Sequence, residues 1–167
     1  MRAVDVVLER NRTFAAAFAH GDAPSSPSLG LAVLTCMDGR VQPARFLELG
    51  VAEAHVLRNA GGRATDDALR SIIVSTQLLG TRACMVIHHT DCGMQTFTND
   101  AVRARLEADT GANADHIDFL PFTDLEESVR ADVGTIRESP LLPDDLDVTG
   151  WVYDVRTGRL TEVTAPS

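Results

Sequence analysis

The chain has 167 residues, 44% of them hydrophobic and 23% charged, which predicts a single globular domain over residues 1–167. Its formal net charge of −9 argues against a sequence-wide electrostatic grip on nucleic acid or anionic lipid. No apolar run approaches the roughly 20 residues of a membrane span, and the N-terminal residues do not resemble a secretory signal. Three cysteines do not make a disulfide framework. We therefore expect a soluble cytoplasmic protein.

Helical and strand patterns alternate along the chain. An apolar helical stripe runs from Val4 to Phe18 and stops near Gly21, and a loop rich in Pro and Ser follows. Continuous apolar runs predict buried strands at 31–36 and 83–89. A further strand is expected within 53–62, running into a glycine loop. Helices are predicted at 42–50, 65–80, 99–111 and 123–140.

Terminal residues support these helices. Pro43 suits a first helical turn, Thr65 an N-cap, and Gly111 a helix end. The last predicted helix opens with a capping box that joins Thr123 to Glu126.

The C-terminal stretch, 150–164, predicts a β-hairpin that turns at Thr157-Gly158. The expected fold is therefore α/β, with a mostly parallel central sheet flanked by helices and an antiparallel edge strand. In such sheets, sites form outside the carboxyl ends of the strands. Cys36 and His89 both lie at such predicted ends.

Two short patterns combine at this edge, "CMDGR" at 36–40 and "HTDC" at 89–92. A bare His-x2-Cys is weak evidence, but Cys36 supplies a second thiolate from a neighbouring strand end. Two thiolates and one imidazole suit Zn²⁺, and three protein ligands leave a fourth position for water. We expect the ligands Cys36, His89 and Cys92.

The two adjacent histidines must be told apart. Neighbours on a strand point to opposite faces, so His88 and His89 cannot both reach one ion unless the strand breaks. His89 lies three residues before Cys92, a spacing that a turn can close onto one metal. His88 is then a buried histidine behind the ligands. Cys84, early in the same strand, is expected in the core.

Asp38 and Arg40 are the candidate catalytic residues. Asp38 is two residues from a ligand, so its carboxylate can reach the open position of the metal. Arg40 can hold that carboxylate in a charge-assisted pair. By itself a D-x-R fragment is more often a solvated surface pair, but beside a zinc thiolate we favour the functional interpretation.

The blocks "CMDGR", "RNAGG" and "HHTDCG" resemble the signature blocks of β-class carbonic anhydrases, especially the short bacterial members. The likeness is dense from about residue 31 to 98, with 52 residues between Cys36 and His89. It implies Zn²⁺ on the three expected ligands and control of the fourth position by Asp38 and Arg40. It also implies reversible hydration of CO₂ to bicarbonate, and a homodimer or homotetramer whose N-terminal helices pack on a partner subunit.

Two alternatives stay open from the sequence. The same site could hydrolyse carbonyl sulfide or carbon disulfide, which are linear, apolar analogues of CO₂. A non-catalytic zinc-binding module, with Asp38 as permanent fourth ligand, is a second possibility, although the presence of Arg40 argues against it.

Overall fold

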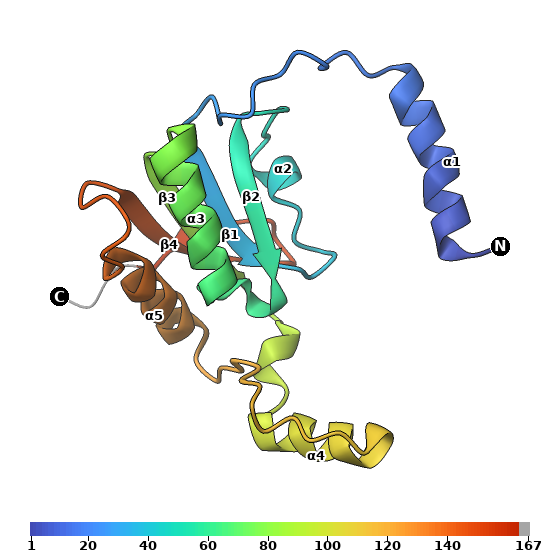
Figure 1. Ribbon diagram of the computed structural model, residues 1–167, viewed down its shortest axis with the longest axis vertical. Helices are drawn as coiled ribbons and strands as arrows, with labels where there is room; N and C mark the ends of the chain where they lie inside the picture. Colours follow the sequence, from blue (N-terminus) through green and yellow to red (C-terminus); the bar gives the residue numbers. More distant parts are fainter. Residues whose placement is uncertain (164–167) are drawn as a thin grey trace.

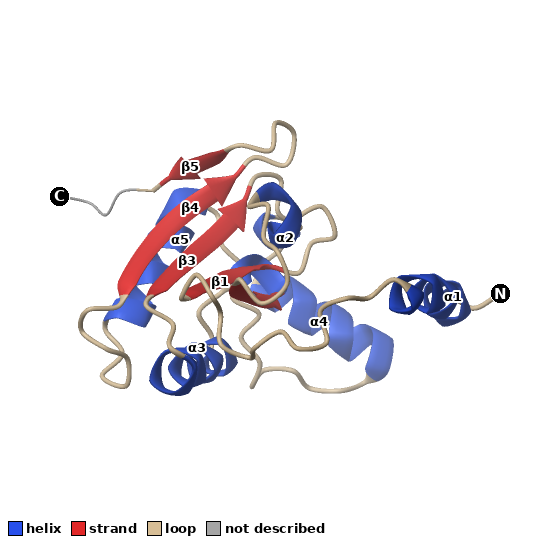
Figure 2. Ribbon diagram, turned by 90° about the horizontal axis from the view of Figure 1, so that it is seen from above, coloured by secondary structure: helices blue, strands red, loops and turns tan. Residues whose placement is uncertain are grey.

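The computed structural model describes residues 1–163, which form a five-stranded sheet with helices around it. The strands are β1 (Leu31–Cys36), β2 (Ala54–Asn59), β3 (Ala83–His89), β4 (Asp147–Tyr153) and β5 (Leu160–Glu162). Their order in the sheet is β2-β1-β3-β4-β5, with the first four parallel and β5 antiparallel to β4 (Figures 1 and 2). The predicted α/β class and the antiparallel edge strand are confirmed.

Five helices accompany the sheet: α1 (Ala3–Ala16), α2 (Pro43–Phe46), α3 (Asp66–Leu79), α4 (Asn99–Thr110) and α5 (Leu125–Arg137). Two short 3₁₀ turns, η1 (Ala60–Gly62) and η2 (Gly93–Gln95), follow the ends of β2 and β3. Helices α3 and α5 cover one face of the sheet, and α2 lies on the other (Figure 1). There the Phe46 ring of α2 stacks on Tyr153 of β4, with ring centroids 4.2 Å apart.

The main core lies between the sheet and helices α3 and α5. Alternate strand residues point into it because side chains on a strand change face at every step. Gly150 lets α5 approach β4 closely, since a Cβ there would lie 2.6 Å from Cγ1 of Val129. The fully buried members of this core include Ala32, Leu34, Ile72, Cys84, Val86, Val129 and Ile136.

Most predicted element ends are confirmed. Thr65 caps α3 by accepting a hydrogen bond from the Ala68 N–H, and Gly111 ends α4 in the left-handed conformation. The hairpin turns through Gly158, with φ +73°. Its last predicted residue, Thr164, lies outside the described residues.

The predicted boundaries of three helices are wrong: the end of α1, the end of α2, and both ends of α5, which stops at Arg137 and not at Pro140. Helix α1 ends at Ala16 rather than near Gly21, because i→i−3 hydrogen bonds from Ala17 and Phe18 tighten and close its last turn. Helix α2 is a single turn that stops before Glu48, which has a φ of +52°, instead of reaching Gly50.

The N-cap of α5 is Asp124 and not Thr123. The Asp124 carboxylate accepts a hydrogen bond of 2.9 Å from the Glu127 N–H. An anionic cap also interacts favourably with the positive end of the helix dipole, which explains why it is used instead of the preceding threonine.

Helix α1 stands away from the body of the molecule and buries none of its residues (Figure 1). Its apolar side chains Val4, Val7, Leu8 and Phe14 are each at least half exposed. No helix among the described residues is long and apolar enough to cross a membrane.

Candidate metal centre

Three buried side chains meet at the carboxyl edge of the sheet. Cys36 ends β1, His89 ends β3, and Cys92 directly precedes η2. One ligand atom from each residue lies within 4.8 Å of the other two, and no side chain of the three exceeds 4% exposure. The structure therefore brings together the three residues that the sequence predicts as metal ligands.

The ring of His89 has one nitrogen free to bind a cation among the described residues. Its Nδ1–H donates a hydrogen bond of 2.9 Å to the Thr90 carbonyl oxygen, which leaves the lone pair on Nε2. Among the described residues, Nε2 is the only buried side-chain nitrogen or oxygen without a hydrogen-bond partner. An orphaned imidazole nitrogen beside two cysteine sulfurs matches the donor set of a zinc site.

The two cysteine sulfurs interact directly, and each changes the pKa of the other. A hydrogen bond from the Cys92 thiol lowers the pKa of Cys36, and the backbone N–H groups of Asp38 and Gly61 lower it further. The resulting anion at Cys36 raises the pKa of Cys92. Burial by itself would lower the pKa of His89, but its contact with the Cys36 thiolate raises it. These interactions stabilise a thiolate at Cys36. A positive charge placed beside the two sulfurs would stabilise this thiolate further.

The predicted Asp38–Arg40 pair is present and bidentate. Arg40 donates from Nε to Oδ1 of Asp38 at 3.0 Å and from Nη2 to Oδ2 at 2.7 Å, and its backbone N–H adds a third bond of 2.9 Å. These hydrogen bonds hold the pKa of the Asp38 carboxyl well below its usual range. The carboxylate lies beside the centre, with Oδ2 4.0 Å from Nε2 of His89.

Two further residues orient this pair, and the sequence analysis did not single them out. The Asp91 carboxylate accepts a hydrogen bond of 2.9 Å from Nη1 of Arg40. The Asp91 carbonyl oxygen accepts another, also of 2.9 Å, from Nη2. Arg58 donates to the carbonyl oxygens of Cys36 and Asp38, at 3.0 and 2.6 Å. Their positions inside "HTDC" and "RNAGG" are the signal that could have identified them.

His88 faces away from the three candidate ligands, as strand alternation predicts. It is fully buried, and its ring contacts Ser128 and Asp132 of α5 instead of the cysteines. Cys84 is also fully buried in the core, where burial raises the pKa of its thiol to about 12. Neither residue contributes a donor to the centre.

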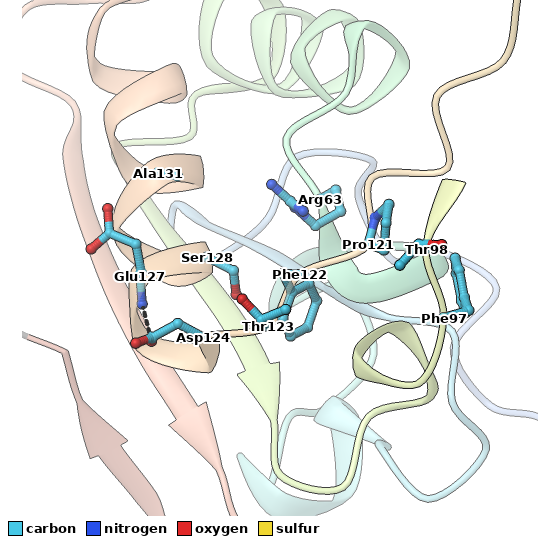
Figure 3. A pocket seen from close by; sticks show the side chains of 10 residues that line it. All are labelled: Arg63, Phe97, Thr98, Pro121, Phe122, Thr123, Asp124, Glu127, Ser128 and Ala131. Carbon is cyan, nitrogen blue, oxygen red and sulfur yellow. Dashed lines mark hydrogen bonds between the residues drawn. The ribbon is translucent and has the colours of Figure 1, made fainter. Parts of the chain in front are cut away.

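An apolar wall separates the centre from a neighbouring pocket. Met94 and the rings of Phe97 and Phe122 pack against the two cysteines. Phe97 and Phe122 also line a pocket of about 350 Å³ beside α5, which Figure 3 shows. The remaining lining residues are Arg63, Thr98, Pro121, Thr123, Asp124, Glu127, Ser128 and Ala131.

Comparisons with known proteins agree with this geometry. The carbonic anhydrase family model matches residues 31–160. The chain is 40% identical to beta-carbonic anhydrase 1 of Mycobacterium tuberculosis, covering 98% of this chain and 99% of that protein. A crystal structure of carbonic anhydrase from Streptococcus mutans superposes with a TM-score of 0.93 at 46% identity, covering 98% of this chain and 99% of that one.

A second group of relatives carries a different name. The carbon disulfide hydrolase of an Acidianus species is 36% identical, over 77% of this chain and 74% of its own length. The similarity to the mycobacterial protein is higher and extends over nearly the whole chain. On its sequence, fold and site, this chain belongs to the β-class of the carbonic anhydrase family.

Proposed function

We propose that this chain is a zinc-dependent carbonate dehydratase, which catalyses the reversible hydration of CO₂ to bicarbonate and a proton. The observation that carries the proposal is the buried group of Cys36, His89 and Cys92, in which Nε2 of His89 has no hydrogen-bond partner among the described residues. The adjacent Asp38–Arg40 pair and the family membership support it.

In this proposal the two sulfurs and Nε2 of His89 hold the zinc ion. Two thiolates neutralise the charge of Zn²⁺, and the neutral imidazole completes three protein ligands, so a fourth position stays open. When bound, the zinc ion supplies the Lewis acidity that makes water nucleophilic near neutral pH.

Asp38 and Arg40 are the proposed catalytic residues at this open position. Because Arg40 keeps Asp38 ionised, the carboxylate can only accept hydrogen bonds, and it would orient a water molecule by accepting a hydrogen bond from it. Arg40 also holds both carboxylate oxygens, which keeps Asp38 from moving onto the metal.

The two sides of the centre suit the two forms of the substrate. CO₂ is linear and donates no hydrogen bonds, so the apolar wall of Met94, Phe97 and Phe122 offers it a dry contact surface. Bicarbonate is an anion, and the side chain of Arg40, which pairs with Asp38 beside the centre, is 47% exposed to solvent. This arrangement favours release of the charged product toward solvent.

A second candidate function uses the same residues. Carbon disulfide and carbonyl sulfide are linear and apolar like CO₂, and several relatives are named carbon disulfide hydrolase. The nearly full-length similarity to a β-carbonic anhydrase favours CO₂ as the substrate. A purely structural zinc module is disfavoured because Arg40 holds the Asp38 carboxylate in a bidentate pair.

We further propose that the enzyme is a homodimer or homotetramer that works in the cytoplasm. The exposed apolar stripe of α1 needs a surface to cover it, and a second copy of the chain supplies one. A reducing compartment keeps Cys36 and Cys92 available as thiolate ligands.

The test combines metal analysis with stopped-flow kinetics on one preparation. We expect about one zinc per chain and rapid CO₂ hydration, with slower hydrolysis of carbonyl sulfide. A zinc-loaded protein that hydrolyses carbonyl sulfide and leaves CO₂ untouched would favour the second candidate. A zinc-loaded protein inactive on both substrates would contradict an enzymatic role.

A further inference from the structure

A buried carboxylate ties three parts of the fold together behind the metal centre. Asp132 of α5 is only 4% exposed. Its Oδ2 lies 3.1 Å from Nε2 of His88 and accepts a hydrogen bond of 2.7 Å from Nε of Arg63, while its Oδ1 accepts one of 3.1 Å from the Ala64 N–H. One side chain therefore links helix α5, the end of β3 and the segment that follows β2.

The first link fixes the end of β3. The ring of His88 is fully buried, with Nδ1 2.8 Å from the hydroxyl of Ser128. Both groups near Nε2, the Asp132 carboxylate and the Gly62 carbonyl at 3.3 Å, are acceptors, so Nε2 carries a proton. His89 leaves the strand on the opposite side, which means that a fixed His88 also fixes the backbone from which the ligand projects.

The second link fixes a glycine segment, Gly61–Gly62, that packs on the first cysteine. Gly62 has a φ of +72°, and a Cβ on it would lie 2.9 Å from the Cys36 backbone nitrogen. Arg63, which follows directly, is anchored by Asp132 on one side and by the Leu120 carbonyl oxygen at 2.7 Å on the other. The position of the Cys36 backbone is thus coupled to the anchoring of Arg63.

An aromatic ring packs against these contacts. Phe122 stacks on His88 with ring centroids 5.5 Å apart, and the Arg63 guanidinium lies 5.7 Å from its centroid. Figure 3 shows Arg63, Phe122 and Ser128 side by side along the pocket next to α5. In this sheltered position, hydrogen bonds hold their geometry more strongly than they would at the surface.

We propose that Asp132 is a positioning residue for the metal centre, which acts on His89 through the end of β3 and on Cys36 through the glycine segment. This inference rests on the proposed function to the extent that the centre binds zinc. If Asp132 were only part of a structural ion pair, its loss would lower the stability of the protein alone. As a positioning residue, its loss also alters the metal centre.

The test is Asp132→Asn, which keeps the size of the side chain but replaces one acceptor oxygen with an NH₂, and this NH₂ must face either the Ala64 N–H or the N–H groups of His88 and Arg63. We expect a folded protein whose zinc dissociation constant is raised by about 10- to 100-fold, as is common when a partner of the ligands is lost. The d–d absorption of the cobalt-substituted protein should shift, because the angles between the ligands change. Asp132→Glu should restore part of the affinity.

The matched control is Glu126→Gln on the same helix. Glu126 also pairs with an arginine, Arg130 at 3.3 Å, but on the surface. We expect this variant to keep wild-type zinc affinity and cobalt absorption. If Asp132→Asn loses thermal stability yet shows the same zinc affinity and cobalt spectrum as wild type, the inference is overturned.

If Asp132→Asn does not fold, a milder variant tests the inference. Ser128→Ala removes the hydroxyl that contacts Nδ1 of His88 and the Leu125 carbonyl oxygen, and it should weaken zinc binding several-fold with a shifted cobalt spectrum. An unchanged spectrum in that variant would overturn the inference. A wild-type protein that takes up neither zinc nor cobalt would instead refute the proposed function, so the two failures are distinguishable.

Discussion

The three candidate ligands differ in charge, and this difference bears on the acidity of the proposed zinc centre. In the proposed centre Cys36 and Cys92 contribute thiolates, whereas His89 contributes an uncharged imidazole, whose Nδ1–H donates to a carbonyl and leaves the lone pair of Nε2 for the metal. Two anionic sulfurs donate more charge to a metal than neutral histidines do, so water bound there should be less acidic. We therefore expect CO₂ hydration to increase toward alkaline pH.

At the residue scale, the ligand assignment predicts which two of the three cysteines bind the metal. Cys36→Ser and Cys92→Ser should each lose most of the bound zinc, because a neutral hydroxyl replaces a thiolate. Cys84→Ala is the control, since Cys84 is buried in the core and should keep zinc while losing some stability. Zinc is quantified by elemental analysis after dialysis. Full zinc occupancy in Cys92→Ser would refute the assignment.

The second prediction at this scale concerns the Asp38–Arg40 pair. Arg40→Ala should keep its zinc but lose CO₂ hydration by about 10- to 100-fold, because the freed Asp38 carboxylate can occupy the open position. The loss should be greater at acid than at alkaline pH, where hydroxide competes with the carboxylate. Arg40→Lys should rescue only partly, since an ammonium cannot form the two-donor fork seen on Asp38.

The measurement for this pair is a pH–rate profile of both variants and wild type, with X-ray absorption reporting the fourth zinc ligand. Wild-type rates in Arg40→Ala, together with a water-bound zinc, would show that the pair is only a surface ion pair.

At the element scale, the ends of the parallel strands β1 and β3 carry the candidate ligands Cys36 and His89, and the turns that pack behind these ends hold the backbone in place. The turn η1 follows β2 and contacts the end of β1 through its glycines. Gly61 and Gly62 both have positive φ values, so the turn depends on residues that adopt this conformation without strain.

This arrangement predicts a difference between two glycines that share a left-handed backbone. Gly62→Ala places a Cβ 2.8 Å from the Thr35 carbonyl carbon, so the end of β1 must shift and zinc affinity should fall by about 10-fold or more. Gly80→Ala has a similar φ of +80° but nothing within 4 Å of the new Cβ. It should cost about 1 kcal/mol of stability and leave zinc binding unchanged.

The two variants are compared by urea unfolding and by zinc titration. Equal zinc affinities in Gly62→Ala and Gly80→Ala would mean that close packing on the Cys36 backbone does not position the ligand.

At the scale of the whole molecule, α1 stands away from the sheet, and none of its residues is buried. Its residues Val4, Val7, Leu8 and Phe14 share one helical face, and none of them is buried. A contiguous apolar face of this kind marks an interaction surface in a globular protein.

We therefore predict that the protein is an oligomer whose assembly needs α1. Light scattering of the zinc-loaded protein should give the mass of a dimer or tetramer, and Leu8→Glu should shift it toward the monomer by placing a charge in the covered face. Glu9→Gln, on the same helix, is the control and should leave the mass unchanged. A stable, active, zinc-loaded wild-type monomer would contradict this prediction.

The sequence by itself determined the fold class and the identity of the candidate ligands. Strands buried on both faces give continuous apolar runs, so β1 and β3 could be located from the chain, and their carboxyl ends then placed Cys36 and His89 at one edge. Alternation along a strand separated His88 from His89 without any knowledge of their partners. These inferences depend on local patterns, which a linear sequence records directly.

Only the tertiary structure decided which distant polar groups meet. Asp132 and Arg63 are 69 residues apart, and no periodicity indicates that they pair behind the centre. The same holds for Asp91, which reaches Arg40 across 51 residues, and for α1, whose stripe predicts burial without naming the surface. The physical reason is that hydrophobic burial follows a repeating pattern along the chain, whereas a buried hydrogen bond depends on where two separate elements are packed against each other.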